Sequence, residues 1–474
     1  MLIVVGLAFA LAGCAHQLPA ADAAGTAPAV PAHWSAGSTG EAQPPTDLAA
    51  WWQRFGDAEL ASLVDDALSA SPTVQSVVAA LRQSRALADV AAAGLLPGLG
   101  ASASAQRSGA PQQSSSNRFG VGLNASWEPD LFGGTRASAD AAQADVRAAQ
   151  MRLADAQVSL AAEVALAWIE QRQLQTRLVI AQGHLAAQDD TLQIARWRHQ
   201  AGLVAVLDVE QASAAAEQTR AQVPLLRASL AQAQHRLAVL TGRAPAELAA
   251  LVAAPVPLPP DELALAFPAD TLRQRPDVRL AEAQAQAAWA RVAQADAARY
   301  PSLNLSASLG LQALTLGGLT GGGAAVRSLM AGLSWPVFDG GASVNRVHAQ
   351  QAALEQAHAN TTATVLRALQ EVEDALATLQ GERDRSGSLQ AAASAAATAA
   401  ALARQQYQAG LIDFRAVLDS QRTLLTTQDS QASGRASLAT SHVRLYKALG
   451  GGWSPVATEP IPSHPIPPLA RGAR

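Results

Sequence analysis

Cysteine is almost absent from this 474-residue sequence, in which Cys14 is the only one. One cysteine excludes both a disulfide framework and a thiolate metal site within a single chain. Methionine is also rare, and the nine histidines are scattered without metal-binding spacing. Phosphate-binding glycine loops and nucleophile elbows are missing as well. We therefore expect no enzyme activity, no catalytic residues, no metal site and no cofactor apart from a covalent lipid considered below.

Strong charge and long apolar runs are lacking too. The formal net charge is −4, and no basic patch stands out, so a nucleic acid partner is not expected. Beyond residue 13 no apolar run reaches the roughly 18 residues that a membrane-spanning helix needs. Aromatic residues make up 4% of the chain, whereas roughly a quarter of the residues are alanine. This composition favours long, closely packed helices.

Cys14 follows a short apolar run over residues 1–13 (MLIVVGLAFALAG). That run is too short to span a membrane and is typical of a signal peptide, although no lysine or arginine precedes it. Leu11-Ala12-Gly13-Cys14 resembles a bacterial lipobox, in which the cysteine is lipidated and becomes the mature N-terminus. The sequence therefore predicts a lipid anchor on Cys14, followed by an N-terminal tail over residues 14–45. The next residue is Ala15 rather than an acid, which resembles sorting to the outer membrane.

The landmarks of the sequence occur twice, in the same order. WEPDLFGG at 127–134 returns in shortened form as WPVFDGG at 335–341, and Ala-Gly-Leu stands at both 201–203 and 409–411. Proline-containing pairs at 71–72 and 96–97 return at 275–276 and 300–301. This order indicates a tandem duplication. The expected boundaries are a first repeat over 46–252, a Pro/Ala linker over 253–260, a second repeat over 261–452 and a C-terminal tail over 453–474.

The sequence patterns of the two repeats predict the same order of helices and strands. A helix begins near Pro72 or Pro276, because proline suits the first helical turn. Two strands around a polar or glycine-rich turn are expected within about 99–127 and again within about 302–335, where apolar residues alternate with a period of two. Long helices are expected over 134–200 and 204–241 in the first repeat, and over 342–408 and 412–449 in the second.

The long helices carry a coiled-coil pattern. Apolar or small residues recur in alternating steps of four and three, a period of 3.5 residues. In the first of these helices the stripe consists of Leu160, Val164, Ala167, Gln171, Leu174, Leu178, Ala181, Leu185, Gln188, Leu192 and Ala195. A helix over 134–200 would be on the order of 100 Å long. Helix periodicity alone would fit a periplasmic structural rod that bridges envelope layers.

The strands argue against a rod. Four strands do not close a barrel, and lipid does not tolerate an open sheet edge. Three chains would supply twelve strands, an even number that can close. The predicted fold is mainly α with a β-barrel segment: a homotrimer in outer membrane lipid, with four membrane strands and long coiled-coil helical hairpins from each chain.

The sequence from Pro45 to Trp453 resembles the TolC-like outer membrane efflux proteins, in their lipoprotein (NodT) branch. The resemblance is carried by WWQRFGD at 51–57, RPDVR at 275–279, Gly340-Gly341 and YKALGGGW at 446–453. It implies a trimeric α/β barrel that serves a tripartite, RND-type efflux pump as a passive exit duct for drugs or other small molecules. It further implies a periplasmic adaptor protein that opens the duct and couples it to an energised inner-membrane pump. An exit channel for type I protein secretion would have the same architecture and remains an alternative.

The resemblance also implies where the adaptor docks. The tips of the two long hairpins, Gly202-Leu203 and Gly410-Leu411, match the ends that face the adaptor in that family. Glycine at a tip permits the positive φ with which a helix ends and the chain reverses.

A periplasmic aperture is implied as well. Tyr407, Asp419 and Arg422 match the residues that draw the helix ends together in the family. Asp419 and Arg422 are three residues apart, so one helix face presents both. Arg415 lies one turn before Asp419, where relatives often have an apolar residue; it either adds a cationic ring or neutralises Asp419.

The acidic turn Glu128-Pro129-Asp130 pairs two carboxylates, which is also a pattern of acid–base catalysis. Here the pair stands where a strand gives way to a long helix. Acids near a helix start are ordinary capping and dipole choices, so we expect a structural role.

Overall fold

The computed structural model describes residues 48–109, 115–247, 254–260 and 269–453. The signal peptide, Cys14, the tail over 14–45 and all of the C-terminal tail except Trp453 lie outside the described residues. No helix in the described part combines the length and the apolar character needed to cross a membrane.

The elements repeat along the chain with equal lengths. Helices α3 and α6 have 22 residues each, α4 and α7 have 67, and α5 and α8 have 35. Their bounds are α3 Pro72–Ala93, α4 Gly134–Gln200, α5 Val206–Leu240, α6 Pro276–Ala297, α7 Ala342–Gln408 and α8 Phe414–Ala448. The strands are β1 Gly98–Ser108, β2 Ser116–Trp127, β3 Ser302–Ala313 and β4 Ala325–Ser334. The shorter elements are η1 Trp51–Phe55, α2 Ala58–Ala70, η3 Ala269–Gln274 and η4 Leu316–Thr320. The predicted four strands and long helices of the duplicated fold are confirmed.

The chain divides into two compact units. The first unit comprises 69–156 and 275–374, and so contains α3, α6, the four strands and the first parts of α4 and α7. The second unit comprises the described residues of 48–68, 157–274 and 375–453. It contains η1, α2, α5, α8 and the remaining parts of α4 and α7.

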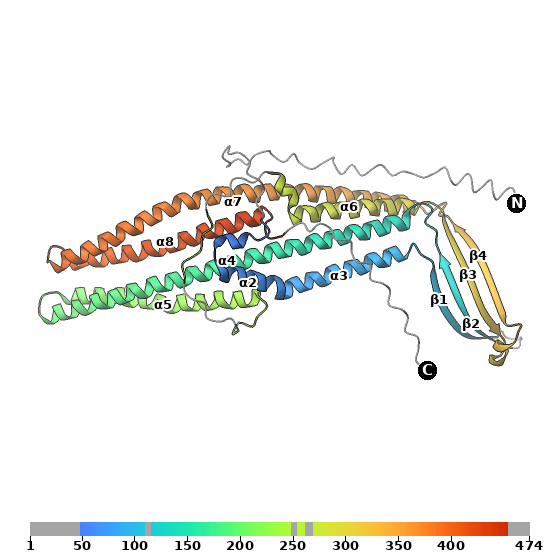
Figure 1. Ribbon diagram of the computed structural model, residues 1–474, viewed down its shortest axis with the longest axis horizontal. Coiled ribbons are helices and arrows are strands. Elements are labelled where there is room, and N and C mark those ends of the chain that lie inside the picture. Colours follow the sequence, from blue (N-terminus) through green and yellow to red (C-terminus); the bar gives the residue numbers. More distant parts are fainter. Residues whose placement is uncertain (1–47, 110–114, 248–253, 261–268, 454–474) are drawn as a thin grey trace. The chain divides into compact units, whose positions relative to one another are not determined.

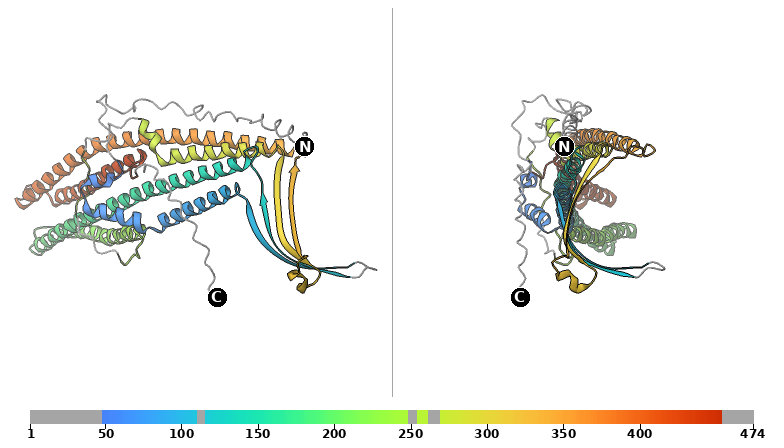
Figure 2. Two further views of the ribbon diagram at one scale, coloured as in Figure 1. Left: turned by 45° about the vertical axis from the view of Figure 1, so that its right-hand side comes forward. Right: turned by 90° about the vertical axis from the view of Figure 1, so that its right-hand side faces the viewer.

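In the first unit the two strand hairpins form a single antiparallel sheet of order β1-β2-β3-β4 (Figure 1). The central pairing, between β2 and β3, joins one repeat to the other and runs from Phe119 opposite Ala313 to Trp127 opposite Leu305. Figure 2 shows that the sheet curves along its strands. Strands β1 and β4 form its two edges, and neither has a further strand beside it in the described chain.

The two faces of the sheet differ in chemistry, because side chains alternate along a strand and the register aligns them across it. Odd-numbered positions give one face that is almost entirely apolar, consisting of Leu99, Ala101, Ala103, Ala105, Arg107, Asn117, Phe119, Val121, Leu123, Ala125, Trp127, Leu303, Leu305, Ala307, Leu309, Leu311, Ala313, Ala325, Arg327, Leu329, Ala331 and Leu333. Even-numbered positions give a face of mostly Ser, Gly, Asn and Gln. On that face Asn124 Nδ2 donates to Ser102 Oγ at 2.9 Å. An apolar outer and a polar inner face are the pattern of a membrane barrel wall.

In the second unit the motifs from the two ends of the described chain meet. Trp51 is fully buried, and its ring stacks on Tyr446 with centroids 5.4 Å apart. Gly451 fits against the Trp51 ring, because a Cβ there would lie 3.0 Å from Trp51 Cδ1. The Gly452 N–H donates to Leu48 O at 2.9 Å. The WWQRFGD and YKALGGGW motifs therefore form one structural lock.

Asp57 and Glu59 attach this lock to α4. Trp168 Nε1 donates to Asp57 Oδ2 at 2.9 Å, and Arg172 Nη2 donates to Glu59 Oε2 at 2.6 Å. The Arg172 guanidinium also lies over the Trp168 ring, 4.1 Å from its centroid. Arg172 is buried, and an unpaired buried guanidinium would be costly, so the carboxylate partner is required.

The RPDVR motif begins α6 in the first unit. Pro276 occupies the first turn after the cap residue Arg275. The Arg275 side chain is buried and donates to Asp277 at 2.8 Å and to Glu371 of α7 at 2.7 Å. Burial lowers the pKa of Arg275, but the hydrogen bonds and charges of the two carboxylates outweigh it, so that the pKa is raised. The motif thus fastens α6 to α7.

The predicted coiled-coil stripe of α4 is turned inward. Every one of its residues in the second unit is buried or half-buried, and Gln171 is fully buried.

Pro224 lies inside α5 at an exposed position, and the helix continues past it. Packing of the buried residues of α5, such as Val223 and Leu237, therefore outweighs the local cost of a proline.

Candidate functional site

The two hairpin tips have the same backbone geometry. Gly202 and Gly410 have φ values of 77° and 76°, a conformation that glycine adopts without strain. Leu203 N donates to Arg198 O at 2.8 Å, and Leu411 N donates to Gln406 O at 2.9 Å. Together with the bonds from each glycine N–H, these are the two hydrogen bonds of a Schellman motif.

Each tip presents a leucine to its surroundings. The side chain of Leu203 is 72% exposed and that of Leu411 is 75% exposed. Since helix-ending motifs need the glycine but not an exposed leucine, the geometry explains Gly202 and Gly410 and leaves the two leucines available for contact with another molecule.

Tyr407 packs near the second tip. Its ring lies 5.4 Å from that of Phe414, and Arg198 of α4 lies over it, 4.5 Å from the ring centroid. Phe414 is buried in a cluster with Leu192 and Ala195 of α4. Tyr407 therefore connects the α7–α8 hairpin to the end of α4, through a cation–π contact that sequence reasoning missed.

Asp419, Arg422 and Arg415 are all exposed on α8. Arg415 Nε lies 3.9 Å from Asp419 Oδ2, too far for a hydrogen bond and worth little in solvent. In the described residues Asp419 and Arg422 form no ion pair with each other. Within one chain, both residues of the expected pair are therefore exposed, and the Asp419 carboxylate has a weak contact with Arg415.

Asp419 and Arg422 have no charged counterparts at the corresponding positions of the first repeat. Aligning the two hairpins at Gly202 and Gly410 gives the corresponding positions. Gln211 then corresponds to Asp419, and Ala214 corresponds to Arg422. His199 likewise corresponds to Tyr407. The residues expected at the aperture therefore occur on α7 and α8 and not at the corresponding positions of α4 and α5.

Helix α8 is bound to α4 of the other repeat by a series of polar contacts. Arg177 Nε donates to Asp429 at 2.6 Å, and His184 Nε2 lies 2.7 Å from Gln428 Oε1. The series also includes Gln173 with Ser433 and Gln421 with Thr191. No sequence signal identified these residues, because periodicity marks the buried face of a helix but not its partner.

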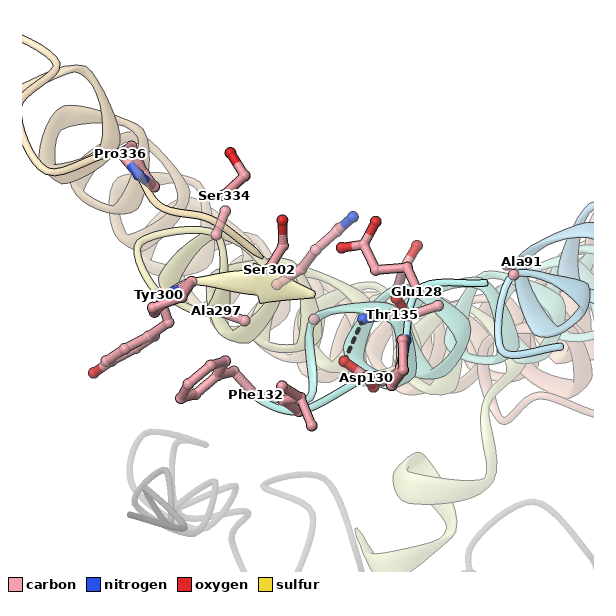
Figure 3. Close-up of a pocket in the computed structure, with 18 of the residues that line it drawn as sticks. Ala91, Glu128, Asp130, Phe132, Thr135, Ala297, Tyr300, Ser302, Ser334 and Pro336 are labelled. Carbon is pink, nitrogen blue, oxygen red and sulfur yellow. Dashed lines mark hydrogen bonds between the residues drawn. The ribbon is translucent and has the colours of Figure 1, made fainter. Parts of the chain in front are cut away.

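A cavity of about 550 Å³ lies in the first unit, where the sheet meets the helices (Figure 3). Phe132 and Tyr300 line it, with rings stacked 5.0 Å apart. Glu128 and Asp130 line it as well. Figure 3 shows the Asp130 carboxylate turned to the start of α4, whereas that of Glu128 lies apart from it.

Asp130 acts as a helix cap. Its carboxylate accepts hydrogen bonds from Thr135 N at 3.2 Å and Arg136 N at 2.8 Å. In the second repeat Asp339 accepts from Gly341 N at 3.0 Å and Ser343 N at 2.8 Å. Backbone hydrogen bonds lower the pKa of Asp339, so it stays ionised at the helix start. The predicted structural role of the acidic turn agrees with this geometry.

Trp127, the last residue of β2, and Trp335, the residue after β4, make matching hydrogen bonds. Trp127 Nε1 donates to Leu95 O at 3.1 Å, and Trp335 Nε1 donates to Arg299 O at 3.2 Å. Both carbonyls lie two residues before the proline that ends the preceding helix. Each indole thus satisfies a carbonyl left open at a helix end, while its ring remains exposed.

Potential metal ligands do not cluster in the described part of the chain: no three His, Cys, Asp or Glu side chains there could hold a metal ion together. The geometry instead offers hairpin tips, an exposed charged helix face and a two-faced sheet.

Comparison with known proteins gives one consistent result. The family model described as "Outer membrane efflux protein" matches residues 63–243 and 267–451. The chain is 31% identical over 426 residues to the probable efflux pump outer membrane protein SepC of Pseudomonas putida, covering 87% of each chain. It is 33% identical over 447 residues to the pyoverdine export outer membrane protein OpmQ of Pseudomonas aeruginosa, covering 90% of this chain and 92% of that one.

Solved structures agree. The outer-membrane channel OprN superimposes with a TM-score of 0.83 and 32% identity, covering 91% of this chain and 99% of that one. The outer membrane protein VceC of Vibrio cholerae gives a TM-score of 0.80 and 27% identity, covering 86% and 99%. Both matches cover most of this chain and nearly all of the other one.

Proposed function

The chain belongs to the outer membrane efflux protein family, and we propose that three copies of it close into one exit duct. It is the outer membrane channel of an efflux pump. The observation that carries the trimer is the sheet, which has four strands, an apolar face and two open edges. Lipid does not tolerate open edges, and three such sheets give a closed twelve-stranded wall. The Ser-, Gly- and Asn-rich face then lines the pore, and the long helices extend the duct into the periplasm.

The assembly is tested by the mass of the detergent-solubilised protein after subtraction of bound detergent. We expect the mass of three chains, and in a strain that lacks its own exit duct we expect the gene to restore efflux. A monomer that also fails to restore efflux would overturn the proposal. The same preparation tests the anchor: the N-terminal peptide of the mature chain should begin at a lipid-modified Cys14, and a Cys14→Ser variant should lack the added mass.

The exposed tip leucines form the surface for the periplasmic adaptor, which couples the duct to an inner-membrane pump. An exposed apolar side chain on a rigid tip supports this, because it gains most from burial against a partner. We expect Leu203→Asp combined with Leu411→Asp to abolish adaptor binding in a pull-down with the purified adaptor. The trimer should form normally, because the backbone bonds of both tips are kept.

A matched control for the tip variants is Leu225→Asp on α5, where the side chain is 69% exposed. This change introduces the same charge on a long helix away from the tips. If Leu225→Asp weakened adaptor binding as much as the tip variants, the adaptor would not bind specifically to the tips.

A further inference from the structure

The apolar face of the sheet contains two cations. Among the odd-numbered positions of the four strands, Arg107 and Arg327 are the charged residues, and both side chains are exposed. Arg327 stands directly opposite Leu309, whose side chain is 62% exposed on the same face. Arg327 therefore places a positive charge among apolar side chains on the face that we expect to contact lipid.

Both arginines lie at the end of the sheet away from the helices. Arg107 is the penultimate residue of β1, and Arg327 is the third residue of β4. A cation on the lipid face is costly at the middle of a bilayer and much less so near its surface. Their position at the outer end keeps that cost small and brings the guanidinium groups to the level of lipid headgroups.

No carboxylate of the two strand hairpins can neutralise these cations. Residues 98–127 and 302–327 contain no Asp or Glu. In the structure Arg107 Nη2 donates to Ser115 Oγ at 3.2 Å, which is a neutral partner. A guanidinium with five donors in a planar fork prefers a carboxylate or a phosphate, and at this surface the lipid can supply the phosphate.

The two arginines also lie on the two edges of the sheet. In the trimer proposed above, β4 of one copy lies beside β1 of the next, since these are the only open edges in the described sheet. Each of the three seams then carries Arg107 from one copy and Arg327 from its neighbour, near the same end and on the same outer face. The pair is complete only in the assembly.

We propose that each seam binds the phosphate group of a phosphorylated lipid of the outer leaflet through Arg107 and Arg327. The guanidinium groups hold the phosphate, and the acyl chains lie against the leucine- and alanine-rich outer face. Binding at the seam would link neighbouring copies, so the lipid would also act as a contact between protomers. This inference rests on the proposed trimer.

The test is native mass spectrometry of the delipidated full-length protein in detergent, titrated with diphosphoryl lipid A. We expect up to three lipids for each trimer. The double variant Arg107→Ala with Arg327→Ala should bind at least about tenfold more weakly, since it loses charge-assisted hydrogen bonds at every seam. Excess inorganic phosphate should not release the lipid, because the acyl chains remain bound.

Arg118→Ala is the matched control. Arg118 stands at the same end of the sheet and is exposed, but its even-numbered position places it on the polar inner face. It should bind lipid A like the unaltered protein. Equal weakening by Arg118→Ala, unchanged binding by the double variant, or release by inorganic phosphate would each overturn the lipid site. The same spectra report the trimer, so a missing trimer would count against the proposed function, whereas a trimer that binds no lipid would count against this inference alone.

Discussion

Replacing Trp51 with alanine is expected to lower the free energy of unfolding by about 3–5 kcal/mol, the usual cost of removing a fully buried tryptophan. Trp51 is 0% exposed, and it contacts Trp52, Phe55 and Tyr446 with ring centroids 5.4–6.0 Å apart. Its loss would also leave Gly451 without the ring against which it packs. The measurement is the thermal unfolding midpoint of the detergent-solubilised protein, which should fall markedly.

The same change at Trp197 provides the comparison. Trp197 lies on α4 with 61% of its surface exposed, so its replacement by alanine should alter the midpoint little. Equal midpoints for the Trp51→Ala and unaltered proteins would mean that the WWQRFGD and YKALGGGW motifs do not lock the second unit.

Removing both charges of the expected aperture, in an Asp419→Ala and Arg422→Ala double variant, should increase single-channel conductance in planar bilayers. Within one chain the two residues are exposed and do not pair with each other, so each is available to the same helix of a neighbouring copy. An exposed ion pair is worth about 0–1 kcal/mol. Three symmetric pairs would shift the balance of closed and open states by up to roughly a hundredfold.

Two further variants test whether the effect is specific to this hairpin and what Arg415 contributes. Gln211→Ala changes the equivalent position of the other hairpin and should leave the conductance as it is. Arg415→Ala tests the first of the two roles considered for that residue: if Arg415 neutralises Asp419 across 3.9 Å, its removal should free Asp419 for a neighbouring copy and tighten the closed state. Unchanged conductance in the Asp419/Arg422 double variant would show that these charges do not hold the duct closed.

Local pattern determined much of this protein. The sequence was sufficient to predict the order of elements in each repeat, the alternation in β2 and β3, and the 3.5-residue stripe of α4. The alternation and the stripe could be predicted because each is a periodic pattern set by the local geometry of a strand or a helix. The four strands and long helices predicted from these patterns are confirmed, and so is the channel family that the motif resemblance implied. Capping residues such as Asp130 were readable for the same reason, since a cap acts within one turn of its helix.

Tertiary structure alone decided which faces meet. The stripe of α4 gives no sign that α8 of the other repeat supplies Asp429 and Gln428 as its polar partners, because helix periodicity is the same for any partner. Nor does the sequence show that Trp51 stacks on Tyr446 or that Arg198 covers Tyr407. These contacts join residues far apart in the chain, and their energy is gained only when the long helices have already packed. The sequence by itself determined the elements and their buried faces. The long-range pairing that joins Trp51 to Tyr446, Arg177 to Asp429 and Arg198 to Tyr407 required the fold.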